Sequence, residues 1–172
     1  MTIGQQSFAL RVGGSSKAEL LSELRGAGVS LNELALALFA DPRFSTSATS
    51  TTVQVVQVSV AALGFPAGAT FASCVERAAL AGLGMCPLEV GPHLRLALLV
   101  QPESERRPAK SGCAPPGAIT VASAPLDDED ETPKGFYLRR IEGTLWLRGY
   151  RSSGGHRWSP EDVFAFVRSR EA

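Results

Sequence analysis

The sequence predicts a single domain of the α+β class, with a mixed or antiparallel sheet, about three short helices and a C-terminal β-hairpin. Its 172 residues, 44% of them hydrophobic and 20% charged, suit one folded core. Helix-capping signals concentrate in the first half of the chain, whereas residues 136–150 carry two β-rich segments around a short turn. These observations together predict one domain over residues 1–172.

The N-terminal segment predicts a strand followed by a helix. Residues 8–12 alternate between apolar and polar side chains, and a pair of glycines ends this pattern. A capping box follows, in which the Ser16 hydroxyl accepts a backbone N–H and Glu19 reaches back to the cap. A stripe of leucines continues the helix as far as Gly26 or Gly28.

A second capping box, from Ser30 to Glu33, predicts a helix that ends near Asp41 and Pro42. A tight turn joins the two helices, as in the helix-turn-helix motif of DNA-binding proteins. The second helix offers only Asn32 and Glu33 for contacts to bases. We therefore favour packing of the two helices as an αα-hairpin over DNA recognition.

The middle of the chain predicts a β-α-β unit. Its β-branched residues, with glutamines between them, predict a strand over residues 53–60. Thr70 is the expected cap of a helix that ends before Gly82, and a second strand is predicted over residues 93–101. If these strands are parallel, the helix between them forms a right-handed crossover.

Two stretches are predicted to be surface loops. Residues 102–117 are rich in proline, charge and small side chains, and residues 123–134 contain an acidic run at 127–131. A short strand is expected between them, over residues 119–122. Five like charges in a row are typical of a solvated loop, which we favour over a metal site.

The clearest local structure is a β-hairpin over residues 136–150. The Glu142-Gly143 pair suits a type I′ turn, which sets a register with Leu138 opposite Leu147. The face that carries these leucines is expected to belong to the core. After the hairpin, a proline-containing turn leads to a final predicted strand over residues 163–167.

The other face of this hairpin alternates aromatic rings with guanidinium groups. Such a face can receive an anion or a stacked base, because arginine offers a planar donor fork and an aromatic ring offers a platform. The structural alternative is a self-satisfied cation–π ladder, or a second buried face. Arg95 and the loop 152–158 would extend the surface. The predicted ligand-binding residues are Tyr137, Arg139, Trp146, Arg148, Tyr150, Arg151 and His156.

Signatures of the common nucleotide-binding enzymes and hydrolases do not occur. The patterns GxxxxGK[ST], GxGxxG, GxSxG and HExxH are all missing from the sequence. Of the two histidines, His156 in its glycine-rich loop is the candidate for acid–base catalysis, and His93 is predicted to be structural. Cys74, Cys86 and Cys113 are predicted to be reduced thiols. No cofactor and no metal site is predicted.

Nothing in the sequence directs the chain into or across a membrane. The apolar stretch over residues 94–100 is interrupted by Arg95 and is far shorter than the roughly 18 to 20 residues of a membrane helix. The N-terminus lacks the basic and apolar regions of a secretory signal. We therefore expect a cytoplasmic protein. Its net charge is zero, but residues 132–172 carry a balance of +4 and residues 127–131 carry −5.

Several stretches carry a family resemblance. They are residues 31–33, 39–44, 86–96, 135–140, 146–151 and 158–162, the last reading Trp-Ser-Pro-Glu-Asp. In these stretches the chain resembles a group of small uncharacterised bacterial proteins, some of which carry the label "helicase". The resemblance implies a bacterial source and a complete protein. Motor activity is not expected, because the chain is too short for paired motor domains and lacks a phosphate loop.

The predicted function is that of a non-enzymatic binding or interaction module that uses the aromatic and arginine face of the hairpin. Its partner would be an unknown protein or a small anionic ligand. Nucleic-acid binding through the same face is one alternative, although the zero net charge argues against it. A small enzyme that uses His156 is the other.

Overall fold

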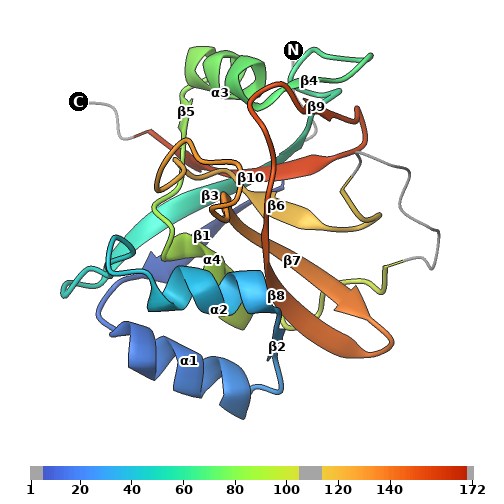
Figure 1. Cartoon of the computed structure of the whole chain (residues 1–172). Coiled ribbons are helices and arrows are strands. Elements are labelled where there is room, and N and C mark those ends of the chain that lie inside the picture. Colours follow the sequence, from blue (N-terminus) through green and yellow to red (C-terminus); the bar gives the residue numbers. More distant parts are fainter. Residues whose placement is uncertain (1–5, 105–113, 170–172) are drawn as a thin grey trace.

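The computed structural model describes residues 6–104 and 114–169, and over these ranges it shows an α+β domain built on one mixed sheet. Eight strands of the described chain form this sheet, in the order β1-β3-β10-β6-β7-β8-β2, with β5 paired to β10 outside that path. A separate two-stranded sheet joins β4 to β9. Helix α3 lies on one side of the sheet, and α1, α2 and α4 lie on the other (Figure 1).

Helices and strands alternate along the described chain. The helices are α1 (Lys17–Gly26), α2 (Glu33–Ala40), α3 (Phe71–Leu80) and α4 (Val90–Ala97). The strands are β1 (Gln6–Val12), β2 (Ser30–Leu31), β3 (Thr51–Ser59), β4 (Ala69–Thr70), β5 (Leu83–Gly84), β6 (Ile119–Val121), β7 (Gly135–Ile141), β8 (Thr144–Tyr150), β9 (Arg157–Trp158) and β10 (Val163–Arg168). Within the described ranges, no helix is both long and apolar enough to cross a bilayer.

Two neighbouring interior strands of the sheet, β3 and β10, are covered on both faces. Val55 and Ala165 belong to a core with α1, α2 and α4, whereas Val58, Phe164 and Phe166 belong to a second core with α3. Two buried faces explain why β10 reads as a nearly continuous apolar run. The sheet therefore separates two hydrophobic cores.

Several sequence predictions are confirmed. The capping box of α1 is present, since the Ser16 hydroxyl accepts the Glu19 N–H at 3.2 Å and the Glu19 carboxylate accepts the Ser16 N–H at 2.7 Å. Thr70 caps α3 by accepting the Ser73 N–H at 3.3 Å. The hairpin β7–β8 has the predicted register, with Leu138 opposite Leu147. Its turn uses positive φ at Glu142 and Gly143, as a type I′ turn requires.

The predicted start of the second helix is wrong. Ser30 lies in β2, which pairs in parallel with β8, and Asn32 is the cap of α2. Helix α2 then packs on β8, where a side chain at Gly149 would meet the backbone of Leu34 at 2.6 Å. Because α2 contacts the sheet and α1 contacts α4, the predicted αα-hairpin does not form.

The predicted strand over residues 93–101 is also wrong, because residues 90–97 form α4. The helix places Val90 and Leu94 in the core one turn apart, and Pro92 is tolerated in its first turn, where no N–H is needed. The predicted β-α-β unit is therefore absent. Strand β3 instead pairs antiparallel with β10, and the strand after α3 is β5.

His93 fastens α4 to the end of β1. Its Nε2 accepts the Gly13 N–H at 3.2 Å, so this nitrogen must be unprotonated. Burial lowers the pKa of His93, while the charges of Glu89 and Glu23 act in the opposite direction. The histidine has the predicted structural role, although on a helix instead of a strand.

The acidic segment folds back on the basic part of the chain. Asp127 accepts a hydrogen bond from the Arg43 guanidinium at 2.6 Å, and Arg151 at the end of the hairpin donates to the Glu131 carbonyl at 2.8 Å. Lys134 donates to the carbonyl of Glu129 at 2.6 Å. Residues 123–134 contain no helix or strand, and neither do the described parts of the other predicted loop, 102–104 and 114–117. Cys113 lies outside the described residues.

Candidate functional site

One row of side chains crosses the sheet from the core below α3 to the outer face of the hairpin. The register places Val58 beside Phe164, Phe164 beside Thr120, Thr120 beside Tyr137, and Tyr137 beside Arg148. The first three are buried and the last two are half-buried. This row therefore passes from the apolar core to a partly open surface. The side chains that pack over the sheet end near the middle members of the row.

Trp158 ends the apolar cover on this face. Its ring centroid lies 4.8 Å from that of Phe164, and Phe71 at the start of α3 lies 5.7 Å from the same Phe164 ring. Beyond Trp158 the face opens into a cavity of about 290 Å³. The cavity is lined by Ala114, Pro115, Thr120, Tyr137, Tyr150, Arg151, Ser152, Ser153, His156 and Trp158.

The small β4–β9 sheet fixes the position of the tryptophan. Ala69 pairs with Trp158 and Thr70 pairs with Arg157, directly before α3 begins. Gly68 has a φ of 84°, and a Cβ at this position would stand 2.4 Å from the Trp158 carbonyl oxygen. Only glycine allows this close approach at that φ without strain. The local backbone thus holds Trp158 over the sheet.

Four rings of the cavity wall meet edge to face. The ring centroids of Tyr137 and Tyr150 lie 6.3 Å apart, those of Tyr150 and Trp158 5.7 Å, and those of His156 and Trp158 5.2 Å. The last two pairs are almost perpendicular, at 89° and 86°. Rings that meet in this way leave parts of their faces uncovered, where a further planar group can pack.

Two hydrogen-bond donors of this wall have no acceptor among the described residues. The Trp158 Nε1–H is one of seven buried side-chain polar atoms in this state, and it has almost no accessible surface of its own. The Tyr150 hydroxyl is not one of these buried atoms. Burial raises the pKa of Tyr150, so the hydroxyl keeps its proton and can donate it to an acceptor. A buried donor without a partner is uncommon in a native structure and needs an explanation.

The cavity wall contains a cation and no carboxylate. Arg151 is one of its members, and none of the described residues that line it is an aspartate or a glutamate. Arg151 pairs with Glu131 at 3.6 Å at the exposed rim, a kind of pair that contributes about 0 to 1 kcal/mol. The guanidinium is therefore available to an anion that enters the cavity.

Asp162 lies behind the wall and is nearly buried. Its carboxylate accepts the Ser159 N–H at 2.8 Å. Burial raises the pKa of Asp162, and hydrogen bonds from Ser159 and Ala114 and the nearby His156 act in the opposite direction. These backbone bonds hold Ala114, which lines the cavity, against the β9–β10 connection. Asp162 thus supports the wall without lining it.

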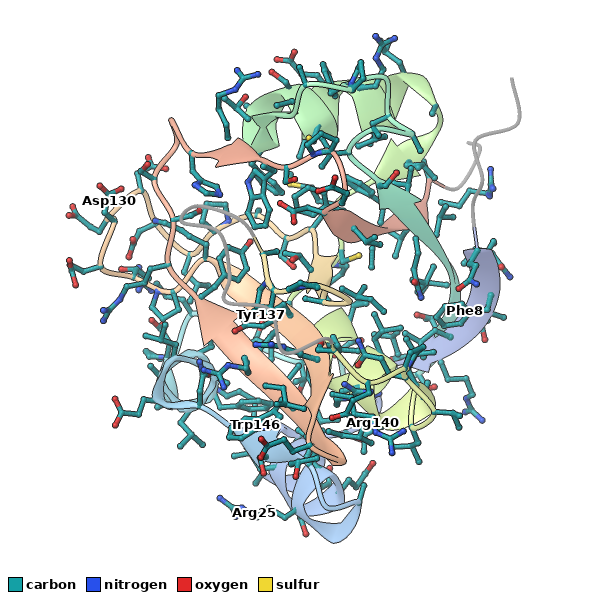
Figure 2. The ribbon with its side chains drawn as sticks, turned by 90° about the vertical axis from the view of Figure 1, so that its right-hand side faces the viewer. Phe8, Arg25, Asp130, Tyr137, Arg140 and Trp146 are labelled. Carbon is teal, nitrogen blue, oxygen red and sulfur yellow. The ribbon has the colours of Figure 1, made fainter. Side chains whose placement is uncertain are left out.

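A second hollow of about 210 Å³ adjoins the cavity and shares Tyr150, Ser152 and Ser153 with it. Its lining has a different character, since it includes Asp128, Asp130 and Lys134. Figure 2 shows Asp130 on the acidic loop, away from Trp146 and the far end of the hairpin. The cavity with Arg151 and the hollow with the two aspartates are therefore neighbours that share the segment after β8.

The remaining residues of the predicted surface form a separate group. The Arg148 guanidinium lies 4.9 Å from the centre of the Trp146 ring, and Arg139 stands opposite Trp146 on the neighbouring strand. None of the three lines the cavity. Tyr137 lies in the half of the hairpin nearer to α3, and Trp146 lies farther away (Figure 2). This half therefore contains the cation–π pair that the structural alternative predicted.

The expected contribution of Arg95 to this surface is wrong. Arg95 lies on α4 and is fully buried. Its guanidinium donates to the Gln101 side chain at 2.7 Å, to the Trp146 carbonyl at 3.2 Å and to the Leu98 carbonyl. Burial lowers the pKa of Arg95 to about 10. This arginine is a clamp beneath the hairpin backbone and cannot meet a ligand on its outer face.

The structure thus brings together four of the seven predicted site residues: Tyr137, Tyr150, Arg151 and His156 line one cavity. The loop 152–158 extends this group, as expected. Sequence reasoning missed Thr120, although a single threonine between two apolar residues of a short strand indicates a side chain on the opposite face. It also missed Ala114 and Pro115, for which the sequence offers no signal.

Within the described ranges, no three His, Cys, Asp or Glu side chains come together in a group that could hold a metal. No family model, no curated protein and no solved structure matches the chain. The resemblance to small bacterial proteins therefore stays a prediction. The function of the chain has to be inferred from the geometry of the cavity.

Proposed function

We propose that this chain is a cytoplasmic binding protein, without catalytic activity, that holds a small anionic ligand in the cavity at the base of the hairpin. One observation carries the proposal: Tyr137, Tyr150, Arg151 and His156, all predicted for binding, line one cavity whose described lining contains no carboxylate. Ligand sites are typically aromatic-lined clefts with a few polar groups that fix orientation. A void left by poor packing is lined by apolar side chains instead.

The proposal narrows the predicted surface to one half of the hairpin. Arg148 already stacks on Trp146 of its own strand, so its charge is partly satisfied without a ligand. The Arg151 Nε donates to the Glu131 carbonyl at 2.8 Å, but among the described residues its other nitrogens meet a carboxylate only in the exposed pair with Glu131 at 3.6 Å. The binding residues are therefore those of the cavity wall, and the Trp146–Arg148 pair supports the strand beside it.

A blocked cavity tests this function. Ser153 is exposed at the rim, so Ser153→Trp adds a ring that can fill the cavity without disturbing the core. A set of small aromatic acids, neutral aromatics and amines is screened against the wild-type chain by saturation-transfer NMR. We expect acids to bind the wild type and to lose at least ten-fold in affinity with Ser153→Trp.

Leu80→Trp is the matched control, because Leu80 is 84% exposed on α3 and outside the cavity. It should bind the same acids as the wild type. Binding that is unchanged in Ser153→Trp would place the ligand elsewhere and contradict the proposal. If single-stranded oligonucleotides bind instead, with an affinity that falls steeply with salt, nucleic-acid recognition replaces small-ligand binding.

A further inference from the structure

The geometry points to a specific class of ligand for this cavity: a heteroaromatic ring that carries an acidic group, of the size of a nucleoside monophosphate. This inference rests on the proposed function, since it names the ligand of the same site. It follows from the size of the cavity, the arrangement of its rings, the Tyr150 hydroxyl and the position of Arg151.

The size of the cavity sets the first limit. Its volume of about 290 Å³ lies at the lower end of small-molecule sites, which span roughly 300 to 1,000 Å³. A single ring system with a short polar extension fits this volume. A dinucleotide or a long peptide would have to leave most of its surface outside.

The rings of the wall favour a planar ligand. Tyr150 and Trp158 meet at 89° and His156 and Trp158 at 86°, so these rings present faces and edges around a common space. Perpendicular rings of this kind could also enclose an organic cation. Arg151 in the wall would repel such a cation, because its carboxylate partner, Glu131, is not among the residues that line the cavity. A neutral or anionic aromatic ring is therefore favoured over a quaternary ammonium group.

The Tyr150 hydroxyl favours a ring that contains an acceptor atom. Tyr150 lines the cavity, keeps its hydroxyl proton, and has no acceptor for it among the described residues. A plain hydrocarbon ring beside it would leave this donor without a partner. A ring nitrogen or carbonyl would accept from it. A heteroaromatic ring is therefore favoured over a hydrocarbon ring.

Arg151 supplies the partner of the acidic group. It lies at the start of the segment that closes the cavity, where Ser152 and Ser153 offer further hydroxyl donors. A guanidinium recognises phosphate or carboxylate through parallel N–H donors. The acidic group therefore lies at the rim, close to solvent, and the ring lies inside against Tyr137 and Trp158.

Trp158 fluorescence tests the inference. The chain has two tryptophans, so Trp146→Phe leaves Trp158 as the only reporter while keeping a ring beneath Arg148. This variant is titrated with adenosine 5′-monophosphate, adenosine, inorganic phosphate, indole-3-acetate and tetramethylammonium. We expect the monophosphate to change Trp158 emission and to bind at least ten-fold more tightly than adenosine or phosphate alone.

Two arginine variants in the Trp146→Phe background separate the roles. Arg151→Gln should remove the ten-fold advantage of the monophosphate and leave adenosine binding unchanged. Arg148→Gln removes the same charge from the neighbouring cation–π pair, outside the cavity, and should change monophosphate binding less than three-fold. Equal losses in both variants would mean a general charge effect and would overturn the assignment of Arg151.

Each probe decides one part of the inference. If phosphate binds as tightly as the monophosphate, the ligand does not need a ring. If adenosine does so, the ligand does not need an acidic group. Binding of tetramethylammonium would contradict both requirements. Tighter binding of indole-3-acetate supports the ring and acid chemistry and identifies aromatic carboxylates as its source. If none of these probes binds while other acids still bind in a Ser153-dependent way, the ligand class is wrong and the proposed function stands.

Discussion

Asn32 joins the start of α2 to β8. The Asn32→Ala variant should therefore unfold at a clearly lower denaturant concentration than the wild type. Its Oδ1 accepts the Ala35 N–H at 2.9 Å as a helix cap and the Gly149 N–H at 2.8 Å, while its Nδ2 donates to the Gly149 carbonyl at 3.0 Å. Loss of the cap costs about 1 kcal/mol. Loss of the two bonds to buried Gly149 adds about 1 kcal/mol each. The free energy of unfolding should therefore fall by about 3 kcal/mol.

Urea unfolding followed by circular dichroism measures this change, with two reference variants. Ser16→Ala removes only the cap of α1 and should cost about 1 kcal/mol. Asn32→Ser keeps a cap but cannot reach both groups of Gly149. Its loss of unfolding free energy should therefore lie between the losses of Ser16→Ala and Asn32→Ala. If Asn32→Ala costs no more than Ser16→Ala, the two bonds to the strand contribute nothing, and the attachment of α2 to β8 depends on packing alone.

Two further predictions concern other contacts of the fold. Gly149→Ala would place a Cβ 2.6 Å from the backbone of Leu34 and should lower the free energy of unfolding by about 1 to 3 kcal/mol, whereas Gly26→Ala, with open space around it, should be neutral or stabilising; equal effects in urea unfolding would contradict the close packing. The pKa of His93 is lowered from 6.5, so the unfolded chain binds the proton more readily and stability should fall as pH drops below about 6.5. His93→Gln can still accept the Gly13 N–H and should flatten this slope; an unchanged slope would show that His93 is not its source.

Elements fixed by neighbouring residues were predictable from the sequence. The hairpin turn needs positive φ at two positions, and Glu142-Gly143 supplies it within a pattern of alternating side chains. The Ser16–Glu19 capping box is likewise a contact over three residues. In both cases, the groups that determine the structure lie a few residues apart. The local sequence therefore suffices to predict the turn and the helix cap.

Elements fixed by distant residues were not predictable. The cap of α2 is Asn32 instead of Ser30 because β2 pairs with β8, and Asn32 bonds to a residue 117 positions away. Both residues are good caps by type, so local preference could not separate them. The choice depends on the sheet edge that Ser30 joins, which no local pattern contains.

The same limit explains the missed helix α4. Leu94, Leu96 and Leu98 alternate with other residues, as in a strand, and Arg95 between them predicts a solvent-facing side chain. In the structure Arg95 points into the protein and meets the carbonyl oxygens of Leu98 and Trp146. A buried cation becomes tolerable only with such partners, and the hairpin that supplies one of them lies far along the chain.

The candidate site shows a mixed outcome for a related reason. Alternation along the hairpin was enough to predict that Tyr137 and Tyr150 share a face, and the register confirms it. Alternation cannot show how far another element covers that face. The cavity exists because Trp158 is the last residue that packs over this face, and it reaches only as far as Tyr150. The β4–β9 pair and the close approach of Gly68 fix the position of Trp158.

The chemistry of the residues along the cross-sheet row supports a ligand site at this boundary over a packing defect. Phe164 is fully buried and apolar, Thr120 is buried but carries a hydroxyl, and Tyr137 is half-buried with one polar end. Amphipathic rings suit a place where apolar side chains give way to water. Water alone does not require an arginine in a wall whose described lining contains no carboxylate. An acidic group of a ligand at the rim would account for this arginine.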